Sequence, residues 1–175
     1  NIQGLEIERC LNYFQKRFLC DELFIQNKIP VILDWIVLQS KKLNNYKWGG
    51  TLGPDFDCSG LIQAAFMRQE IFIPRDSYQI MRFCRHLFNF PGPIDQLQMG
   101  DLLFFGDNNV CNHVAIYSHE GYYYHSSGIE FGRDGIYKER LYESEYDDNT
   151  SNYYRSKLIS AGRVTRSYLW NKPLR

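Results

Sequence analysis

The chain has 175 residues, which suits one domain with a hydrophobic core of useful size. Its 20 basic and 20 acidic residues cancel, so the charge does not indicate nucleic acid or an anionic membrane as the main partner. No run approaches the roughly 18 apolar residues of a bilayer span, and we expect no stable membrane insertion.

The five cysteines are an odd number without a paired Cys-x-x-Cys spacing. We therefore expect neither a zinc site nor a full disulfide framework, and no metal or other cofactor. At least one thiol is free in a monomer, the state we expect, while a Cys10–Cys20 pair stays open. The chain starts at Asn1 rather than methionine, which favours removal of an N-terminal piece such as a signal peptide, a preceding domain or a tag.

Residues 1–29 contain a helical repeat of apolar residues, followed by an irregular stretch to Pro30. A second helix is predicted over residues 31–43. Its buried side is formed by Ile32, Trp35 and Ile36. We therefore divide the chain into an N-terminal helical extension, residues 1–30, and a main domain, residues 31–175.

The stretch PDFDCSGLIQAAF, from Pro54 to Phe66, places Cys58 at the start of a predicted helix. Glycines and Pro54 break regular structure before it, and Asp57 is a good N-cap. Free backbone N–H groups and the helix dipole favour an anion in a first turn. We expect the Cys58 thiol to ionise more easily than a free cysteine, whose pKa is about 8.5. Cys58 is a candidate nucleophile; the alternative is a small buried hydrophobic residue.

A further helix is predicted from Asp76 or Ser77 to about Phe88, and the Pro-Gly-Pro run that follows ends it. From Met99 the spacing changes to that of strands. The predicted strands are LLFFG, HVAIYS and YYYHSS, then a hairpin turning at residues 133–135, a loop or short helix over 143–152 and a closing strand over 157–164. Helices first and strands later predict an α+β fold, with helices packed against a central antiparallel β-sheet.

A thiol nucleophile needs a base, which is usually histidine. We interpret His86, beside an arginine in a helical pattern, as a surface or structural residue, and His119, in a turn, as solvated. A three-residue turn with Gly121 in the left-handed conformation makes His113 and His125 diagonal neighbours on one sheet face, with Cα atoms roughly 7–8 Å apart. One imidazole can then orient the other. The alternative is that both fill a sheet face among tyrosines.

Three blocks of the sequence, YKWGGTLGPDFDCSGLIQ, QMGDLLFF and NHVAIYSHEGYYYHSS, resemble the signature blocks of the NlpC (NlpC/p-sixty) family of cell-wall cysteine peptidases. The resemblance covers roughly residues 31–164 and implies a papain-like core with the nucleophile at a helix N-terminus. It implies a cysteine peptidase or amidase that acts outside the cytoplasm on peptidoglycan stem peptides. The bond commonly cleaved joins D-glutamate, through its γ-carboxyl, to the following diamino acid.

The resemblance assigns Cys58 as the nucleophile, His113 as the base and His125 as the residue that orients the base. It also implies a set of substrate-binding or oxyanion-binding residues around the nucleophile. These are Tyr46, Asp57, Ser59 and Arg75, with Gln79 one position earlier than the family pattern.

Two stretches depart from that pattern. Residues 1–29 match nothing recognisable, which leaves wall anchoring and substrate selection open. Cys111 lies two residues before His113 and is expected on the same sheet face, as a second thiol or as packing. Two other functions stay open: a related thiol acyl-hydrolase or acyltransferase acting on another amide or a lipid, and a wall-binding or toxin-like module that binds without cleaving.

Overall fold

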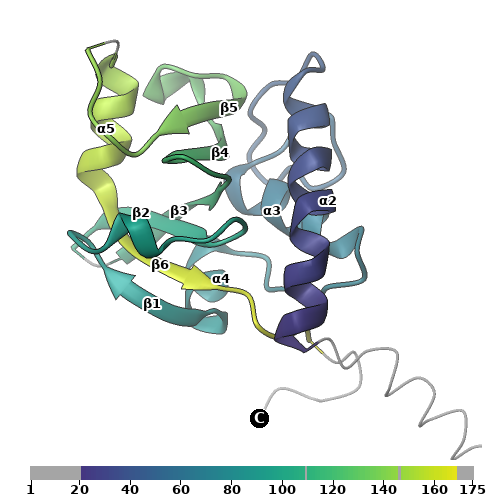
Figure 1. Ribbon diagram of the computed structural model, residues 1–175. Coiled ribbons are helices and arrows are strands. Elements are labelled where there is room, and N and C mark those ends of the chain that lie inside the picture. Colours follow the sequence, from purple (N-terminus) through teal and green to yellow (C-terminus); the bar gives the residue numbers. More distant parts are fainter. Residues whose placement is uncertain (1–20, 109, 146, 169–175) are drawn as a thin grey trace, which may run out of the picture.

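The computed structural model describes residues 21–108, 110–145 and 147–168. Its fold is built on antiparallel strand pairing. The strands are β1 (Arg85–Asn89), β2 (Leu102–Asp107), β3 (Val110–Tyr117), β4 (Tyr122–Ser127), β5 (Gly135–Arg140) and β6 (Leu158–Arg163). The helices are α2 (Glu22–Ser40), α3 (Cys58–Met67), α4 (Ser77–Phe83) and α5 (Asn149–Lys157), with 3-10 turns η1 (Ile94–Gln96) and η2 (Ile129–Phe131). These strands form one six-stranded sheet in the order β1-β6-β2-β3-β4-β5, so the predicted α+β fold is confirmed (Figure 1).

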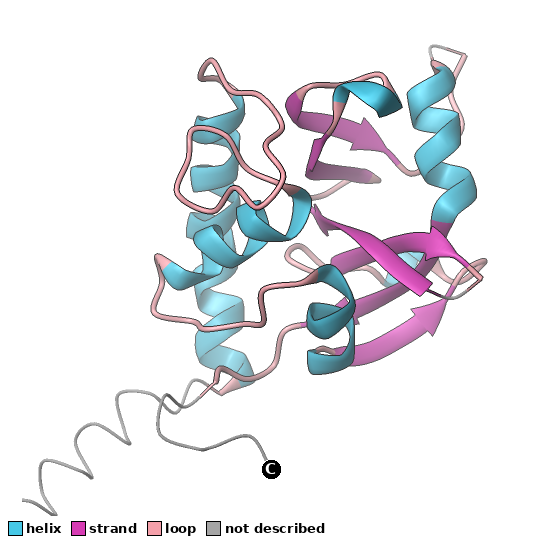
Figure 2. Ribbon diagram, turned by 180° about the vertical axis from the view of Figure 1, so that it is seen from behind, coloured by secondary structure: helices cyan, strands magenta, loops and turns pink. Residues whose placement is uncertain are grey.

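The sheet separates two hydrophobic clusters. On one face, α2, α3 and α4 pack against Val114 and Ile116 of β3. On the other face, α5 covers Phe105, Ala115 and Tyr123. Figure 2 shows the three helices of the first face together and α5 on the far side of the sheet. The alternation predicted for β3, with Ala115 opposite in direction to Val114 and Ile116, is therefore confirmed.

Helix α2 begins at Glu22, well before the predicted start at residue 31. Asp21 caps it, because its carboxylate accepts the N–H of Phe24 at 2.8 Å. The predicted irregular stretch to Pro30 is therefore wrong: Pro30 lies inside the helix on its exposed side, where the carbonyl left without an N–H partner can bind water. The buried face that holds the helix in place consists of Ile25, Ile29, Ile32, Leu33 and Ile36.

The predicted division after residue 30 falls within α2 and stays a prediction. The first part of the predicted extension, residues 1–20, lies outside the described residues, and so does the open Cys10–Cys20 pairing. Among the residues that the structure describes, none of the helices has the length and apolar character needed to cross a membrane.

Helix α4 ends at Phe83 rather than near Phe88. The next residues form β1, which pairs with β6, for instance Arg85 with Arg163. Our prediction extended the helix to about Phe88 because apolar residues recur at helical spacing up to Leu87. Pairing with the distant strand β6 determines the structure of these residues instead. Leu87 then packs against the cluster on the α5 side of the sheet.

The β3–β4 hairpin has the predicted register. Ile116 pairs with Tyr124 and Tyr117 with Tyr123, and Gly121 has the expected left-handed φ of 80°. The next hairpin differs, because Gly135 is already the first residue of β5 and the connection includes η2. The region 143–152 holds the start of α5, and β6 forms the predicted closing strand, inserted between β1 and β2.

A buried ion pair between Asp101 and Arg163 generates a stability prediction. Asp101 is fully buried and accepts Arg163 Nε at 2.6 Å and Nη2 at 2.8 Å. Asp101→Ala leaves the guanidinium buried and unpaired, so we expect the free energy of unfolding to fall by ~3–5 kcal/mol in urea titrations. The control is Glu22→Gln at the exposed Glu22–Arg85 pair, expected to cost about 1 kcal/mol or less. Equal losses in the two variants would contradict the prediction.

Candidate active site

Asp57 fixes the chain on both sides of Cys58. Its Oδ1 accepts the N–H of Gly60 at 2.6 Å, which makes it the predicted N-cap of α3, and its Oδ2 accepts the N–H of Gly49 at 2.9 Å. Arg75 donates to Oδ1 at 3.2 Å and to Oδ2 at 2.5 Å, and also to Ser59 Oγ at 2.8 Å. Asp57, Ser59 and Arg75 thus come together at the first turn of α3, as a paired and hydrogen-bonded cluster.

Cys58 is the first residue of α3 and only 7% exposed. Burial, and after it the charge of Asp57, raises the pKa of the Cys58 thiol to about 11, although hydrogen bonds from the backbone of Val114 and Ser59 lower it. Our expectation of an unusually acidic thiol is therefore wrong for the free protein. The start of the helix favours the thiolate, but desolvation beside a carboxylate outweighs that effect.

The two histidines predicted to be neighbours are in direct contact. His113 Nε2 lies 2.8 Å from His125 Nδ1, which confirms that one imidazole can orient the other. Burial lowers the pKa of both imidazoles, so both are neutral near pH 7. His86 and His119 are exposed, as interpreted from the sequence.

The hydrogen-bonded ladder between the strands that carry these histidines is short. The β3–β4 ladder is confined to Ile116–Tyr124 and Tyr117–Tyr123, whereas β4 continues to pair with β5 as far as Ser127. Helix α3 contacts both β3 and β4. Because the backbone of Val114, the residue after His113, hydrogen-bonds to Cys58, the sulfur lies beside β3.

Cys111 lies on the opposite sheet face from His113, so our placement of it was wrong. Phe105 pairs with His113 but Gly106 pairs with Cys111, which leaves an extra residue in β3. Such a β-bulge reverses the direction of the side chains beyond it. Cys111 consequently packs in the cluster beneath α3 and α4, where a hydrogen bond with Ser77 acts on its thiol.

Tyr46 also reaches this region. It forms an isolated bridge with Phe56, and its N–H donates to Asp134 at 2.8 Å. Burial raises the pKa of Tyr46, and the neighbouring Cys58 and Asp57 raise it further, so its hydroxyl lies near both. Gln79, by contrast, accepts the N–H of Asp76 at 3.4 Å and so supports the first turn of α4.

Two residues that sequence reasoning missed complete the surroundings. The ring of Tyr154, from α5, contacts the rings of both His113 and His125. Ser126 donates to the carbonyl of Phe56 at 2.6 Å and so ties β4 to the segment before the nucleophile. No motif marks either one, because Tyr154 follows a polar run and Ser126 is one serine among several.

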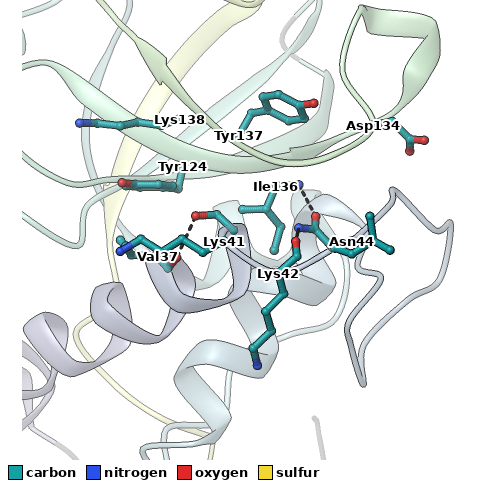
Figure 3. A pocket seen from close by; sticks show the side chains of 11 residues that line it. Val37, Lys41, Lys42, Asn44, Tyr124, Asp134, Ile136, Tyr137 and Lys138 are labelled. Atoms are coloured by element: carbon teal, nitrogen blue, oxygen red, sulfur yellow. Dashed lines mark hydrogen bonds between the residues drawn. The ribbon is translucent and has the colours of Figure 1, made fainter.

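A separate hollow lies between the end of α2 and strands β4 and β5, and Figure 3 shows Tyr124 and Lys138 along one wall. Its lysines do not converge on one point: the Lys42 amine donates to Gln39 at 3.0 Å, and that of Lys138 lies 3.9 Å from the ring centroid of Tyr122. Cys58 and the two histidines do not line it. Within the described part of the chain, no three His, Cys, Asp or Glu side chains are grouped to hold a metal ion.

Comparison with known proteins matches residues 43–163 to the model of the NlpC/P60 family. A Bacillus subtilis protein named bifunctional muramidase/DL-endopeptidase CwlT is 32% identical over 126 residues, which are 68% of this chain and 32% of that protein. A Bacillus cereus gamma-D-glutamyl-L-lysine dipeptidyl-peptidase is 38% identical over 88 residues, 49% of this chain and 25% of that protein. The chain thus spans about a third or less of the length of these curated relatives.

The same likeness extends to solved structures. The crystal structure of an NlpC/P60 family protein from Bacillus cereus superimposes with a TM-score of 0.58 at 28% identity. The match covers 75% of this chain and 40% of that one. The described fold is therefore shared with a protein that contains further parts.

The close approach of α3 to the glycine-rich loop generates a first prediction for the site. A Cβ atom at Gly60 would lie 2.0 Å from the carbonyl oxygen of Gly50. Gly60→Ala must therefore displace the start of α3, and we expect a loss of roughly 1–3 kcal/mol in the free energy of unfolding. Gly49→Asn is the control, because the space at Gly49 is open and asparagine tolerates its left-handed φ. Wild-type stability of the Gly60 variant would refute the clash.

The raised pKa of Cys58 generates a second prediction. Alkylation follows the thiolate fraction, so its rate with iodoacetamide should keep rising from pH 7 toward the pKa of about 11. Asp57→Asn removes a charge that raises this pKa, and should shift the profile to lower pH. Mass spectrometry of the modified peptides measures the rates, with buried Cys84, whose pKa is raised to about 12, as an internal reference. A plateau near pH 7 would instead reveal a preformed thiolate.

Proposed function

The chain belongs to the NlpC/P60 family, and from that membership we propose that it is a cysteine hydrolase of peptidoglycan stem peptides. The observation that carries the proposal is the place of Cys58, at the start of α3 and beside the hydrogen-bonded His113–His125 pair. All three residues lie in the segment that matches the family. We propose Cys58 as nucleophile, His113 as base and His125 as the residue that orients the base.

The bond that we propose is the one between D-glutamate, through its γ-carboxyl, and the following diamino acid. The names of two relatives support this choice, since one is called a DL-endopeptidase and the other a gamma-D-glutamyl-L-lysine dipeptidyl-peptidase. Such a substrate implies action outside the cytoplasm, in the periplasm, in the cell wall or after secretion. We propose that the chain works as a monomer, because the triad comes entirely from α3, β3 and β4.

Because the thiol and both imidazoles are neutral before the reaction, the proposed mechanism begins with a proton transfer from Cys58 to His113. The Cys58 proton moves to His113 as the sulfur attacks the amide carbon, so the thiolate forms only during attack. The resulting imidazolium protonates the leaving amine, and the C–N bond breaks to leave a thioester. Water, deprotonated by His113, then attacks the thioester, releases the new carboxylate and restores the thiol. His125 stabilises the imidazolium through the hydrogen bond at His113 Nε2.

Groups around the nucleophile supply the remaining interactions in this proposal. Backbone N–H groups at the start of α3 and the hydroxyl of Tyr46 are the candidate donors to the developing oxyanion, each typically worth on the order of a hundredfold in rate. Asp57, Ser59 and Arg75 form a polar wall in which Asp57 offers negative charge to the amino end of the stem peptide. Arg75, partly exposed, offers positive charge to a substrate carboxylate.

The other two functions predict different outcomes for the same site. A thiol acyl-hydrolase or acyltransferase would keep the cysteine and histidines and act on another amide or a lipid. A non-cleaving binding module would not need a base beside Cys58, so the contact between His113 and His125 argues against it.

Digestion of defined muropeptides tests the proposal. The wild-type protein should release a new amine terminus, detected by mass spectrometry, and Cys58→Ala should abolish release while the protein stays folded. His113→Ala should lower the rate by about 10²–10⁴-fold through loss of the base. Cys84→Ala is the matched control, because that buried thiol lies at the end of α4, beside Asp101 and Arg166, and should be dispensable. Turnover by pure Cys58→Ala protein would overturn the assignment.

A further inference from the structure

Tyr154 occupies the space between α5 and the two histidines. It is 3% exposed, and its hydroxyl lies 2.6 Å from the hydroxyl of Ser127 on β4. Its ring centroid lies 4.9 Å from that of His113 and 4.5 Å from that of His125. One side chain from outside the three signature blocks of the sequence therefore touches both imidazoles and is itself held by a hydrogen bond.

The second observation concerns His125, which is fully buried. Its Nδ1 is engaged with His113, but among the described residues its Nε2 has no hydrogen-bond partner. The ring centroids of Tyr154 and Tyr123 lie 4.5 and 5.4 Å from that of His125, and their ring planes stand at 81° and 75° to the imidazole plane. A buried N–H is tolerated against the negative face of an aromatic ring, whereas a buried lone pair is repelled by it.

The two possible tautomers of this pair have opposite consequences for catalysis. With the His125 proton on Nδ1, that N–H donates to His113 Nε2, and the proton of His113 must sit on Nδ1. With the His125 proton on Nε2, its Nδ1 accepts the N–H of His113 Nε2, and His113 Nδ1 keeps a free lone pair. Only the second state leaves His113 able to accept a proton from Cys58 through Nδ1.

We propose that Tyr154 is a positioning residue which, by enclosing His125 in an aromatic surrounding, fixes the tautomer that keeps His113 Nδ1 unprotonated. This inference rests on the proposed roles of Cys58 and His113, and it adds a residue from α5 that sets the state of the base. Tyr123 forms the second wall of the same enclosure.

Helix α5 is anchored strongly enough to serve this role. Glu139, which is 4% exposed, accepts Arg133 Nε at 2.6 Å and the hydroxyl of Ser151 at 2.9 Å. Asp148 caps α5 by accepting the N–H of Ser151 at 2.8 Å and also pairs with Arg133. These contacts fix α5 against β5, and the Ser127 hydroxyl then sets how Tyr154 lies against the imidazoles.

The experiment measures the tautomer directly, by nitrogen-15 NMR of histidine-labelled protein near pH 7. In the wild type, His113 should show a protonated Nε2 and an unprotonated Nδ1. Tyr154→Phe keeps the ring and should keep this pattern, whereas Tyr154→Leu should give a mixture of tautomers. Tyr153→Leu is the control for loss of a neighbouring ring: Tyr153 stacks on Phe131 and contacts the ring of Tyr154, and among the described residues it makes no ring contact with either histidine.

Kinetics supply the second readout. Tyr154→Leu should lower kcat on a stem peptide at least tenfold with little change in KM, because the base rather than substrate binding is affected; Tyr154→Phe should restore most of kcat. A wild-type His113 protonated on Nδ1, or an unchanged tautomer in folded Tyr154→Leu, overturns the inference. The NMR readout needs no substrate, so the inference survives if stem peptides prove not to be cleaved, and cleavage survives if the tautomer prediction fails.

Discussion

The site depends first on one buried carboxylate. Asp57 binds the N–H of Gly60 inside α3, the N–H of Gly49 in the preceding loop and the guanidinium of Arg75, and so joins three segments. This arrangement orients Cys58 at the first turn of α3. The same negative charge opposes ionisation of the adjacent thiol, so the group that holds the proposed nucleophile in place also lowers its acidity.

In the proposed mechanism, the base comes from the other face of the sheet. The imidazoles of His113 and His125 pack among the aromatic residues under α5, whereas Cys58 belongs to the cluster under α2 and α3. The β3–β4 ladder is limited to Ile116–Tyr124 and Tyr117–Tyr123, and the proposed proton transfer between Cys58 and His113 uses this break in the sheet. The bulge in β3 places the second thiol, Cys111, on the opposite face from His113.

Features set by local sequence could be predicted, and those set by distant contacts could not. The Asp57 cap, the helix at Cys58 and the register of the His113–His125 hairpin follow from short-range spacing and turn geometry. The early start of α2 follows from a local cap, Asp21, that our prediction overlooked, whereas the pairing of β1 depends on the distant strand β6. The raised pKa of Cys58 was missed for a similar reason, since the helix start is visible in the sequence but the desolvation around it is not.

The chain order of the last two elements has a consequence for biosynthesis. Strand β6 is the last of the six in sequence, yet it lies between β1 and β2, and α5 directly precedes it. During translation β1 cannot join the rest of the sheet, because β6 lies between β1 and β2, and Tyr154 cannot cover the imidazoles until residues 149–163 have left the ribosome. A nascent or truncated chain would therefore carry all three proposed catalytic side chains without an assembled site, which delays any hydrolytic activity until synthesis of this region is complete.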